Sequence, residues 1–278
     1  MIEIIEILKA ILFGIVEGIT EWLPISSTGH MILLDEFINL KVTDEFYDLF
    51  QVVIQLGAIL AVVIMYFKTI CPFGFGKNKE EQKSTWNLWG KILVACLPAA
   101  IIGILFDDWL DEHLYNSVVV SLTLIIYGII FIVIESKKFG KRETKDLDKI
   151  TYKQALGIGA FQLLSLIPGT SRSGSTIIGG LILGLERSVA ASFTFFLAIP
   201  VMVGASLLKL LKYILKVGFI FQTGELLLLG VGCLVAFIVS ILIIKFLMNY
   251  IRKHDFKVFG YYRIVLGIIV LAYFLFLS

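Results

Sequence analysis

The sequence has little charge and no polar region of domain size. Only 17% of its 278 residues are charged, whereas a soluble domain carries about 25%. Apolar residues make up 58% of the chain, and the mean hydropathy is +0.93. No polar stretch is long enough for a separate soluble domain. The composition therefore predicts an all-α polytopic membrane protein that forms one integral domain over residues 1–278.

The low net charge and the small number of cysteines further restrict what kind of protein this is. The net charge is only +2, and the basic residues lie between apolar runs without forming a continuous basic region, so no nucleic-acid partner is expected. The three cysteines (Cys71, Cys96 and Cys233) have neither metal-ligand nor disulfide spacing, which predicts buried free thiols. The first ten residues, "MIEIIEILKA", carry acids where a signal peptide has basic residues, so no cleavage is expected.

Six apolar stretches are close to the ~20 residues that cross a bilayer as a helix. They are 46–68, 88–106, 117–135, 188–212, 225–247 and 258–277. Two other apolar stretches, 1–40 and 152–185, are interrupted midway by proline, glycine and hydroxyl residues. Such interruptions free backbone groups that lipid cannot satisfy. We therefore expect each of these two stretches to form a re-entrant helix pair.

The charges of the loops predict an orientation. Loops 69–87, 137–153 and 248–257 are rich in lysine and arginine, whereas loop 107–116 has neither. The positive-inside rule places the basic loops in the cytoplasm. The segment "KLLKYILK", residues 209–216, then lies on the outer side as an exception to the rule.

This layout predicts an inverted repeat. Each half, about 1–136 and about 150–278, contains one re-entrant pair followed by three spans, and an odd number of spans reverses the second half. The alignment pairs Gly14 with Gly159, Ser26 with Ser171, and Gly29 with Gly174. Inverted repeats with broken helices commonly bind their ligand where the two halves meet. We expect the two broken tips to form one composite site.

The first tip carries acids and hydroxyls. Glu17 and Glu21 are four residues apart and share one helix face, and the cost of burying acids in lipid directs them into a polar cavity. Ser26, Ser27 and Thr28 begin a second short helix, whose N-terminus attracts anions, although plain helix capping gives the same pattern.

The second tip, "PGTSRSGST", adds Arg172, whose planar guanidinium suits phosphate. A structural ion pair between Arg172 and a glutamate is the alternative. His30 lies one turn after the first serines, as an acid or base or as a structural residue. Gln51 and Gln55 line the cavity or bond between helices. The residues expected to contact substrate are Ser26, Thr28, Gly29, Ser171, Ser173 and Thr176.

Together these groups predict phosphoryl chemistry on an anionic lipid. Arg172 and backbone N–H groups would hold the phosphoryl oxygens. Ser27 would attack as nucleophile with His30 as its acid or base, or Ser27 would only bind. Glu17 and Glu21 would hold a divalent cation, Mg²⁺ or Ca²⁺, or one of them would position water. The residues alone do not choose between these roles.

The motifs resemble a known family. The acid pair Glu17-x3-Glu21 leading into "PISSTGH", the segment "PGTSRSGST" from Pro168 to Thr176, and "FTFFLAIP" closely resemble the bacterial undecaprenyl-diphosphatase (bacitracin-resistance) family. The similarity extends to "FQVVIQLG" and to "YYRIVLGI" near the C-terminus. The family motifs, Glu/Gln-x3-Glu and P-G-x-S-R-S-x2-T, are both complete in this sequence.

The resemblance implies hydrolysis of undecaprenyl diphosphate to the monophosphate, which recycles the lipid carrier for peptidoglycan and confers bacitracin resistance. It also implies a divalent cation, roles for Glu17, Glu21, Ser27, His30 and Arg172, and a site on the outer face of the bacterial cell membrane. The rivals are a polyprenyl-phosphate transporter or flippase, which needs a phosphate grip but no nucleophile, and a structural membrane subunit. A homo-oligomer is compatible with the sequence, which leaves oligomeric state open.

Overall fold

The computed structural model describes residues 3–73, 76–114, 116–137, 142–218, 221–222 and 224–276, with only the backbone described at 107, 108 and 111. Within these ranges the regular elements are helices, apart from one isolated bridge between Thr144 and Leu185. The expected all-α class is confirmed. Lys138 and Lys141 of the basic loop 137–153 lie outside the described residues.

Six helices are long and apolar enough to cross a membrane. All six expected spans are therefore confirmed, with ends shifted by a few residues in most cases. The helices are α3 (Asp44–Met65), α5 (Lys79–Leu114), α6 (Ser117–Lys137), α9 (Arg187–Val217), α10 (Glu225–Ile251) and α11 (Lys257–Phe276).

Helix α5 is much longer than expected, because it absorbs parts of both neighbouring loops. The expected loop 107–116 is helical as far as Leu114, and half of loop 69–87 is the first turns of α5. Asn78 and Glu81 stabilise this start reciprocally, since each accepts the backbone N–H of the other at 2.9 Å. The expectation of loops was wrong there because hydropathy does not report polar residues that extend a helix beyond the membrane.

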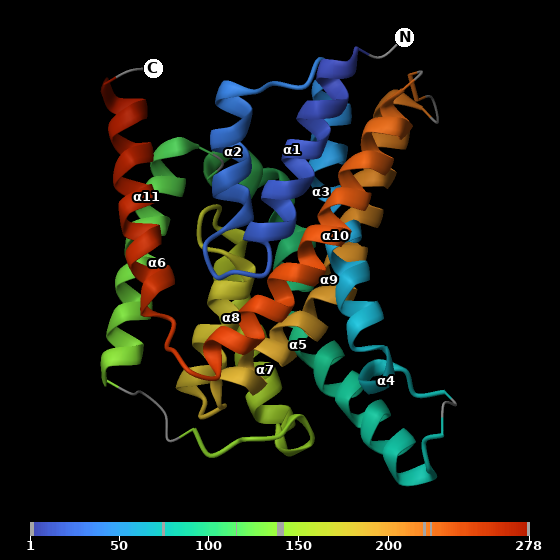
Figure 1. Ribbon diagram of the computed structural model, residues 1–278, viewed down its shortest axis with the longest axis vertical. Coiled ribbons are helices and arrows are strands. Elements are labelled where there is room, and N and C mark those ends of the chain that lie inside the picture. Colours follow the sequence, from blue (N-terminus) through green and yellow to red (C-terminus); the bar gives the residue numbers. More distant parts are fainter. Residues whose placement is uncertain are drawn as a thin grey trace.

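The two interrupted stretches form helical hairpins. The first consists of α1 (Ile4–Thr20) and α2 (Ser27–Phe37), and the second of α7 (Tyr152–Gln162), the 3-10 helix η2 (Leu163–Leu166) and α8 (Arg172–Ile182). Figure 1 shows the two hairpins extending from opposite ends of the molecule, so that their tips meet near its middle. Short helices α4 (Phe67–Ile70) and η1 (Leu147–Lys149) lie in the connections.

The long helices pack around the hairpins at short distances. Helix α10 packs on α1 and α3, α5 packs on α7, and α6 packs on α11. A Cβ atom on Gly57 of α3 would lie 2.1 Å from the carbonyl oxygen of Cys233 in α10, and Gly128 and Gly260 permit the same approach between α6 and α11. Because lipid supplies no hydrophobic force between helices, such close packing holds them together.

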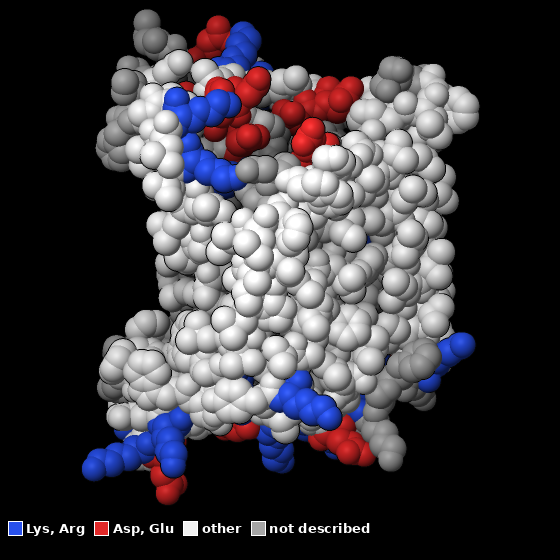
Figure 2. Space-filling model, turned by 180° about the vertical axis from the view of Figure 1, so that it is seen from behind, with Lys and Arg blue, Asp and Glu red and all other residues white. Residues whose placement is uncertain are grey.

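The surface agrees with a lipid environment. Figure 2 shows a broad band almost without charged side chains between two charged ends. Large apolar side chains of the long helices are exposed, among them Leu105 of α5, which is 69% exposed, and Leu242 of α10, which is 62% exposed. Both termini lie at the end opposite the basic loops (Figure 1). The protein is a multi-pass membrane protein.

Candidate active site

The two tips have the same local structure. Ser26 begins α2 and Ser171 begins α8, with φ angles of 75° and 74°. The hydroxyl of Ser26 accepts the N–H of Gly29 at 3.3 Å, and that of Ser171 accepts the N–H of Gly174 at 3.1 Å. A left-handed backbone at serine costs free energy and persists only where the surroundings impose it. Both tips are therefore held in shape by their packing.

One buried arginine from the other end of the chain holds both tips. Arg263 of α11 is fully buried, and its guanidinium donates to the carbonyl oxygen of Pro24 at 3.1 Å. The same group donates to the carbonyl oxygens of Gly169 and Thr170 at 2.8 and 2.9 Å. It also lies 5.6 Å from the centre of the Tyr127 ring. These contacts place the first tip directly beside the second.

A polar cavity of about 260 Å³ lies where the tips meet. Six of the residues expected in the site line it, four from the first tip and two from the second tip. They are Glu21, Ser26, Ser27, Thr28, Ser171 and Arg172. Gln55 of α3 also lines the cavity. The composite site expected between the two tips is present as a cavity.

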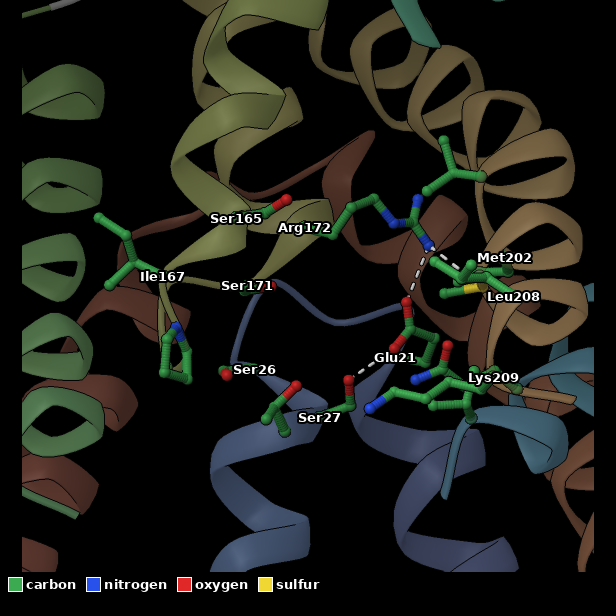
Figure 3. Close-up of a pocket in the computed structure, with 17 residues that line it drawn as sticks. Glu21, Ser26, Ser27, Ser165, Ile167, Ser171, Arg172, Met202, Leu208 and Lys209 are labelled. Carbon is green, nitrogen blue, oxygen red and sulfur yellow. Dashed lines mark hydrogen bonds and ion pairs between the residues drawn. The ribbon is translucent and has the colours of Figure 1, made fainter. Parts of the chain in front are cut away.

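Three of these side chains contact one another across the cavity (Figure 3). The hydroxyl of Ser27 donates to Oε2 of Glu21 at 2.6 Å, and Nη2 of Arg172 donates to Oε1 at 2.8 Å. Nη1 of Arg172 donates to the carbonyl oxygen of Thr194 at 2.8 Å. The Nε atom of Arg172 is buried and has no hydrogen-bond partner among the described residues. Glu21 thus contacts both the Ser27 hydroxyl and the Arg172 guanidinium, whose Nε–H group is an unused hydrogen-bond donor among the described residues.

The other expected residues lie around the cavity and do not line it. Glu17 is buried one turn before Glu21, and its Oε1 atom has no hydrogen-bond partner among the described residues. The Ser173 hydroxyl is 3.3 Å from the carbonyl oxygen of Leu23, which links the tips. Thr176 accepts a hydrogen bond from the Thr194 hydroxyl at 2.8 Å. These contacts stabilise the surroundings of Arg172.

His30 is oriented away from the cavity by two contacts. Its Nδ1 atom is 2.7 Å from the carbonyl oxygen of Ser26, and its Nε2 atom is 2.7 Å from the hydroxyl of Tyr262. A carbonyl oxygen only accepts, so Nδ1 carries a proton, and in the neutral ring Nε2 accepts from Tyr262. In this geometry both ring nitrogens are engaged, and Glu21 is the group that faces Ser27.

Two site residues were missed by sequence reasoning. Arg263 stands alone within the apolar run "YYRIVLGI", and a single charge inside a span was a signal that could have identified it. Lys209 of α9 lines the polar cavity, but the sequence showed it only as part of an exception to the positive-inside rule. Neither residue has a sequence neighbour in the two tips.

A second, apolar cavity of about 520 Å³ adjoins the polar one. It lies between α5, α9 and η2, and it shares lining residues with the polar cavity at one end. The shared residues are Ser165, Val201, Ala205 and Leu208. Gln162 also lines the apolar cavity, and its side-chain amide is buried without a hydrogen-bond partner among the described residues. A polar chamber therefore opens into an apolar one.

The family model described as "Bacitracin resistance protein BacA" matches residues 10–269. The chain belongs to this family. It is 61% identical to an undecaprenyl-diphosphatase of Enterococcus faecalis over 97% of this chain and 98% of that protein. It is 59% identical to undecaprenyl-diphosphatase 1 of Clostridioides difficile over 98% of this chain and 97% of that protein. A third relative, an undecaprenyl-diphosphatase of Desulfitobacterium hafniense, is 59% identical over 98% of this chain and 97% of that protein.

Proposed function

We propose that this protein hydrolyses undecaprenyl diphosphate to undecaprenyl phosphate and inorganic phosphate. The observation that supports this proposal most directly is the convergence of Ser27, Glu21 and Arg172 on one cavity. The names of the relatives, at up to 61% identity over nearly the whole chain, supply the substrate. Hydrolysis would return the lipid carrier to cell-wall synthesis, which is consistent with the bacitracin resistance in the family's name.

The mechanism assigns one task to each of the three side chains. Arg172 binds oxygens of the terminal phosphoryl group through its donors and stabilises the charge that they carry in the transition state. Ser27 attacks the terminal phosphorus, and Glu21, 2.6 Å from the hydroxyl, takes its proton. The phosphorus–oxygen bond to the lipid phosphate breaks, and undecaprenyl phosphate leaves. Water then attacks the phosphoserine and releases inorganic phosphate.

Other expected residues position this machinery. Ser26, Thr28 and Ser171 present hydroxyls and helix N-termini to the anion. His30 holds the carbonyl oxygen of Ser26 and the hydroxyl of Tyr262, so we assign it to shaping the first tip. Gly29, Ser173 and Thr176 hold the two tips in place through hydrogen bonds outside the cavity.

Glu17 would hold a divalent cation, together with Glu21, which would take this role in addition to that of the base. Carboxylate oxygens are the ligands that Mg²⁺ and Ca²⁺ prefer, and the unpartnered Oε1 atom of buried Glu17 fits such a ligand. When bound, the cation would neutralise part of the charge of the diphosphate. The described residues contain no group of three metal-ligating side chains, so further ligands would come from substrate and water.

The apolar cavity favours a lipid over a soluble diphosphate. A substrate with its diphosphate beside Arg172 would extend its first isoprenoid units past Ser165 into the cavity of about 520 Å³. Burial of such a tail against the apolar side chains would favour binding of the lipid, whereas inorganic pyrophosphate has no apolar group to bury there. The hydrophobic band in Figure 2 would hold the remainder of the tail in the bilayer.

We also propose that the two hairpins are re-entrant and that the halves 1–136 and 150–278 are an inverted repeat. Their opposite directions in Figure 1 and the matching caps at Ser26 and Ser171 support this arrangement. With the basic loops in the cytoplasm of a bacterial cell, the polar cavity opens toward the outer face of the cell membrane.

Purified protein in detergent micelles with undecaprenyl diphosphate and Mg²⁺ or Ca²⁺ tests the function. We expect release of one phosphate per lipid, measured colorimetrically, together with the monophosphate lipid by mass spectrometry. Arg172→Ala is expected to abolish release while the protein remains folded. Translocation of labelled lipid across vesicles without phosphate release would instead support a transporter.

A further inference from the structure

The segment 209–216, "KLLKYILK", places lysines at the outer end of α9, where the loop charges do not predict them. Lys209, Lys212 and Lys216 recur every three or four residues and so share one face of the helix. Lys216, at the outer end, is 70% exposed and pairs with Glu45 at 2.9 Å. Lys209, about two turns deeper, lines the polar cavity. One face of α9 thus leads from the outer surface to the site.

Figure 3 shows the Lys209 side chain extending from α9 toward Glu21 and Ser27. It enters from the side of the cavity opposite the hydroxyls of the two tips. Arg172 contacts Glu21 from the second tip at 2.8 Å. The Ser27–Glu21 pair therefore lies between two cationic side chains, which come from different helices.

The charges of the site indicate why a lysine at this position would assist binding of the diphosphate. Glu21 is buried and pairs with the guanidinium of Arg172 at 2.8 Å, so part of the positive charge of Arg172 is neutralised before the substrate binds. A diphosphate brings several further negative charges into a cavity with low dielectric, where repulsion between like charges is strong. A site of this composition needs additional positive charge on the protein to bind the anion. The ammonium group of Lys209 supplies it at the mouth of the cavity.

We propose that Lys209 is a second phosphate-binding cation, which donates to the terminal phosphoryl group of the substrate and to the phosphate that is released. The inference rests on the proposed function, because it concerns the same diphosphate. Arg172 and Lys209 would hold the terminal phosphoryl group from two sides while Ser27 attacks it.

Three variants of the full-length purified protein test this proposal: Lys209→Met, Lys209→Arg and the control Lys216→Met. A lost charge-assisted hydrogen bond predicts that Lys209→Met raises KM for undecaprenyl diphosphate about tenfold, which corresponds to about 1.4 kcal/mol. Lys209→Arg keeps the charge and should stay within about threefold of the wild type. Lys216→Met removes only an exposed ion pair and should leave KM unchanged.

Binding of inorganic pyrophosphate, measured by calorimetry, gives a second readout that needs no turnover. Lys209→Met should weaken this binding about tenfold, whereas Lys216→Met should not. Unchanged pyrophosphate affinity and KM in Lys209→Met would overturn the proposal. This holds also if the substitution lowers the unfolding temperature, because the lysine would then have only a structural role. A wild-type protein that binds pyrophosphate through Lys209 but releases no phosphate would refute the proposed function and leave the inference standing.

Discussion

The 2.6 Å contact between Ser27 and Glu21 leads to a prediction about how two substitutions combine. If Glu21 removes the proton from the Ser27 hydroxyl as it attacks, the two side chains act as one unit. A positioned base contributes about 10²–10⁴-fold to a rate, so Glu21→Gln should lower kcat by that factor. Ser27→Ala should lower it at least as far, because no nucleophile remains for the base to activate.

The Ser27→Ala, Glu21→Gln double variant distinguishes side chains that act together from side chains that contribute independently. If the two side chains act independently, the losses in kcat should multiply to about 10⁴–10⁸-fold. If they act as one unit, kcat of the double variant should be little lower than that of the worse single variant. Glutamine is chosen at position 21 because its carbonyl oxygen still accepts from Arg172, which also keeps its contact with Thr194. The buried guanidinium is thus not left unpaired, and the protein should remain folded.

The assay is steady-state phosphate release from undecaprenyl diphosphate, with thermal unfolding measured on each variant. Ser121→Ala is a matched control, since that buried hydroxyl bonds only to the backbone of its own helix at 2.6 Å and should keep its kcat. If Ser27→Ala retains more than about a tenth of the wild-type kcat, or if the single effects multiply, activated water replaces Ser27 as the nucleophile.

Three further changes test the surroundings of the site. Arg263→Lys leaves at least one of three buried carbonyl oxygens without its donor, at about 1–3 kcal/mol, so thermal unfolding should shift downward and kcat should fall as the tips lose register. Gly204 faces open space in the apolar cavity, so Gly204→Leu should raise KM for the long-chain lipid without destabilising α9. Gly230 also has no close neighbour, and Gly230→Leu should leave KM unchanged. Removing divalent cations with EDTA should lower kcat at least about tenfold, and Mg²⁺ or Ca²⁺ should restore it unless Glu17 is replaced by glutamine.

Much of the fold was predictable because its signals are local. A run of about 20 apolar residues forms a spanning helix wherever it occurs in the chain, since each helix satisfies its own backbone in lipid. The interruptions at Pro24 and Pro168 identified the two tips for the same reason. The ends of α5 were not predictable from hydropathy, because polar helix formers continue the helix beyond the membrane boundary.

The residue types of the site were also evident from the sequence, but their partners were not. Acids, hydroxyls and an arginine at two broken helices indicated phosphoryl chemistry, and six of the expected residues line one cavity. Sequence spacing placed His30 near Ser27, yet the fold turns the His30 ring toward Tyr262. Spacing defines a helix face, whereas the packing of other helices decides what that face meets.

The sequence by itself determined the membrane class, the six spans, the two interrupted hairpins and the kind of chemistry, because each follows from residues close together in the chain. Only the tertiary structure decided that Glu21 joins Ser27 to Arg172, that Arg263 of α11 holds both tips, and that Lys209 of α9 reaches the cavity. Apart from the hydrogen bond between Ser27 and Glu21, these contacts join residues far apart in the sequence. They depend on how each helix is rotated and placed against its neighbours, and no local pattern specifies that.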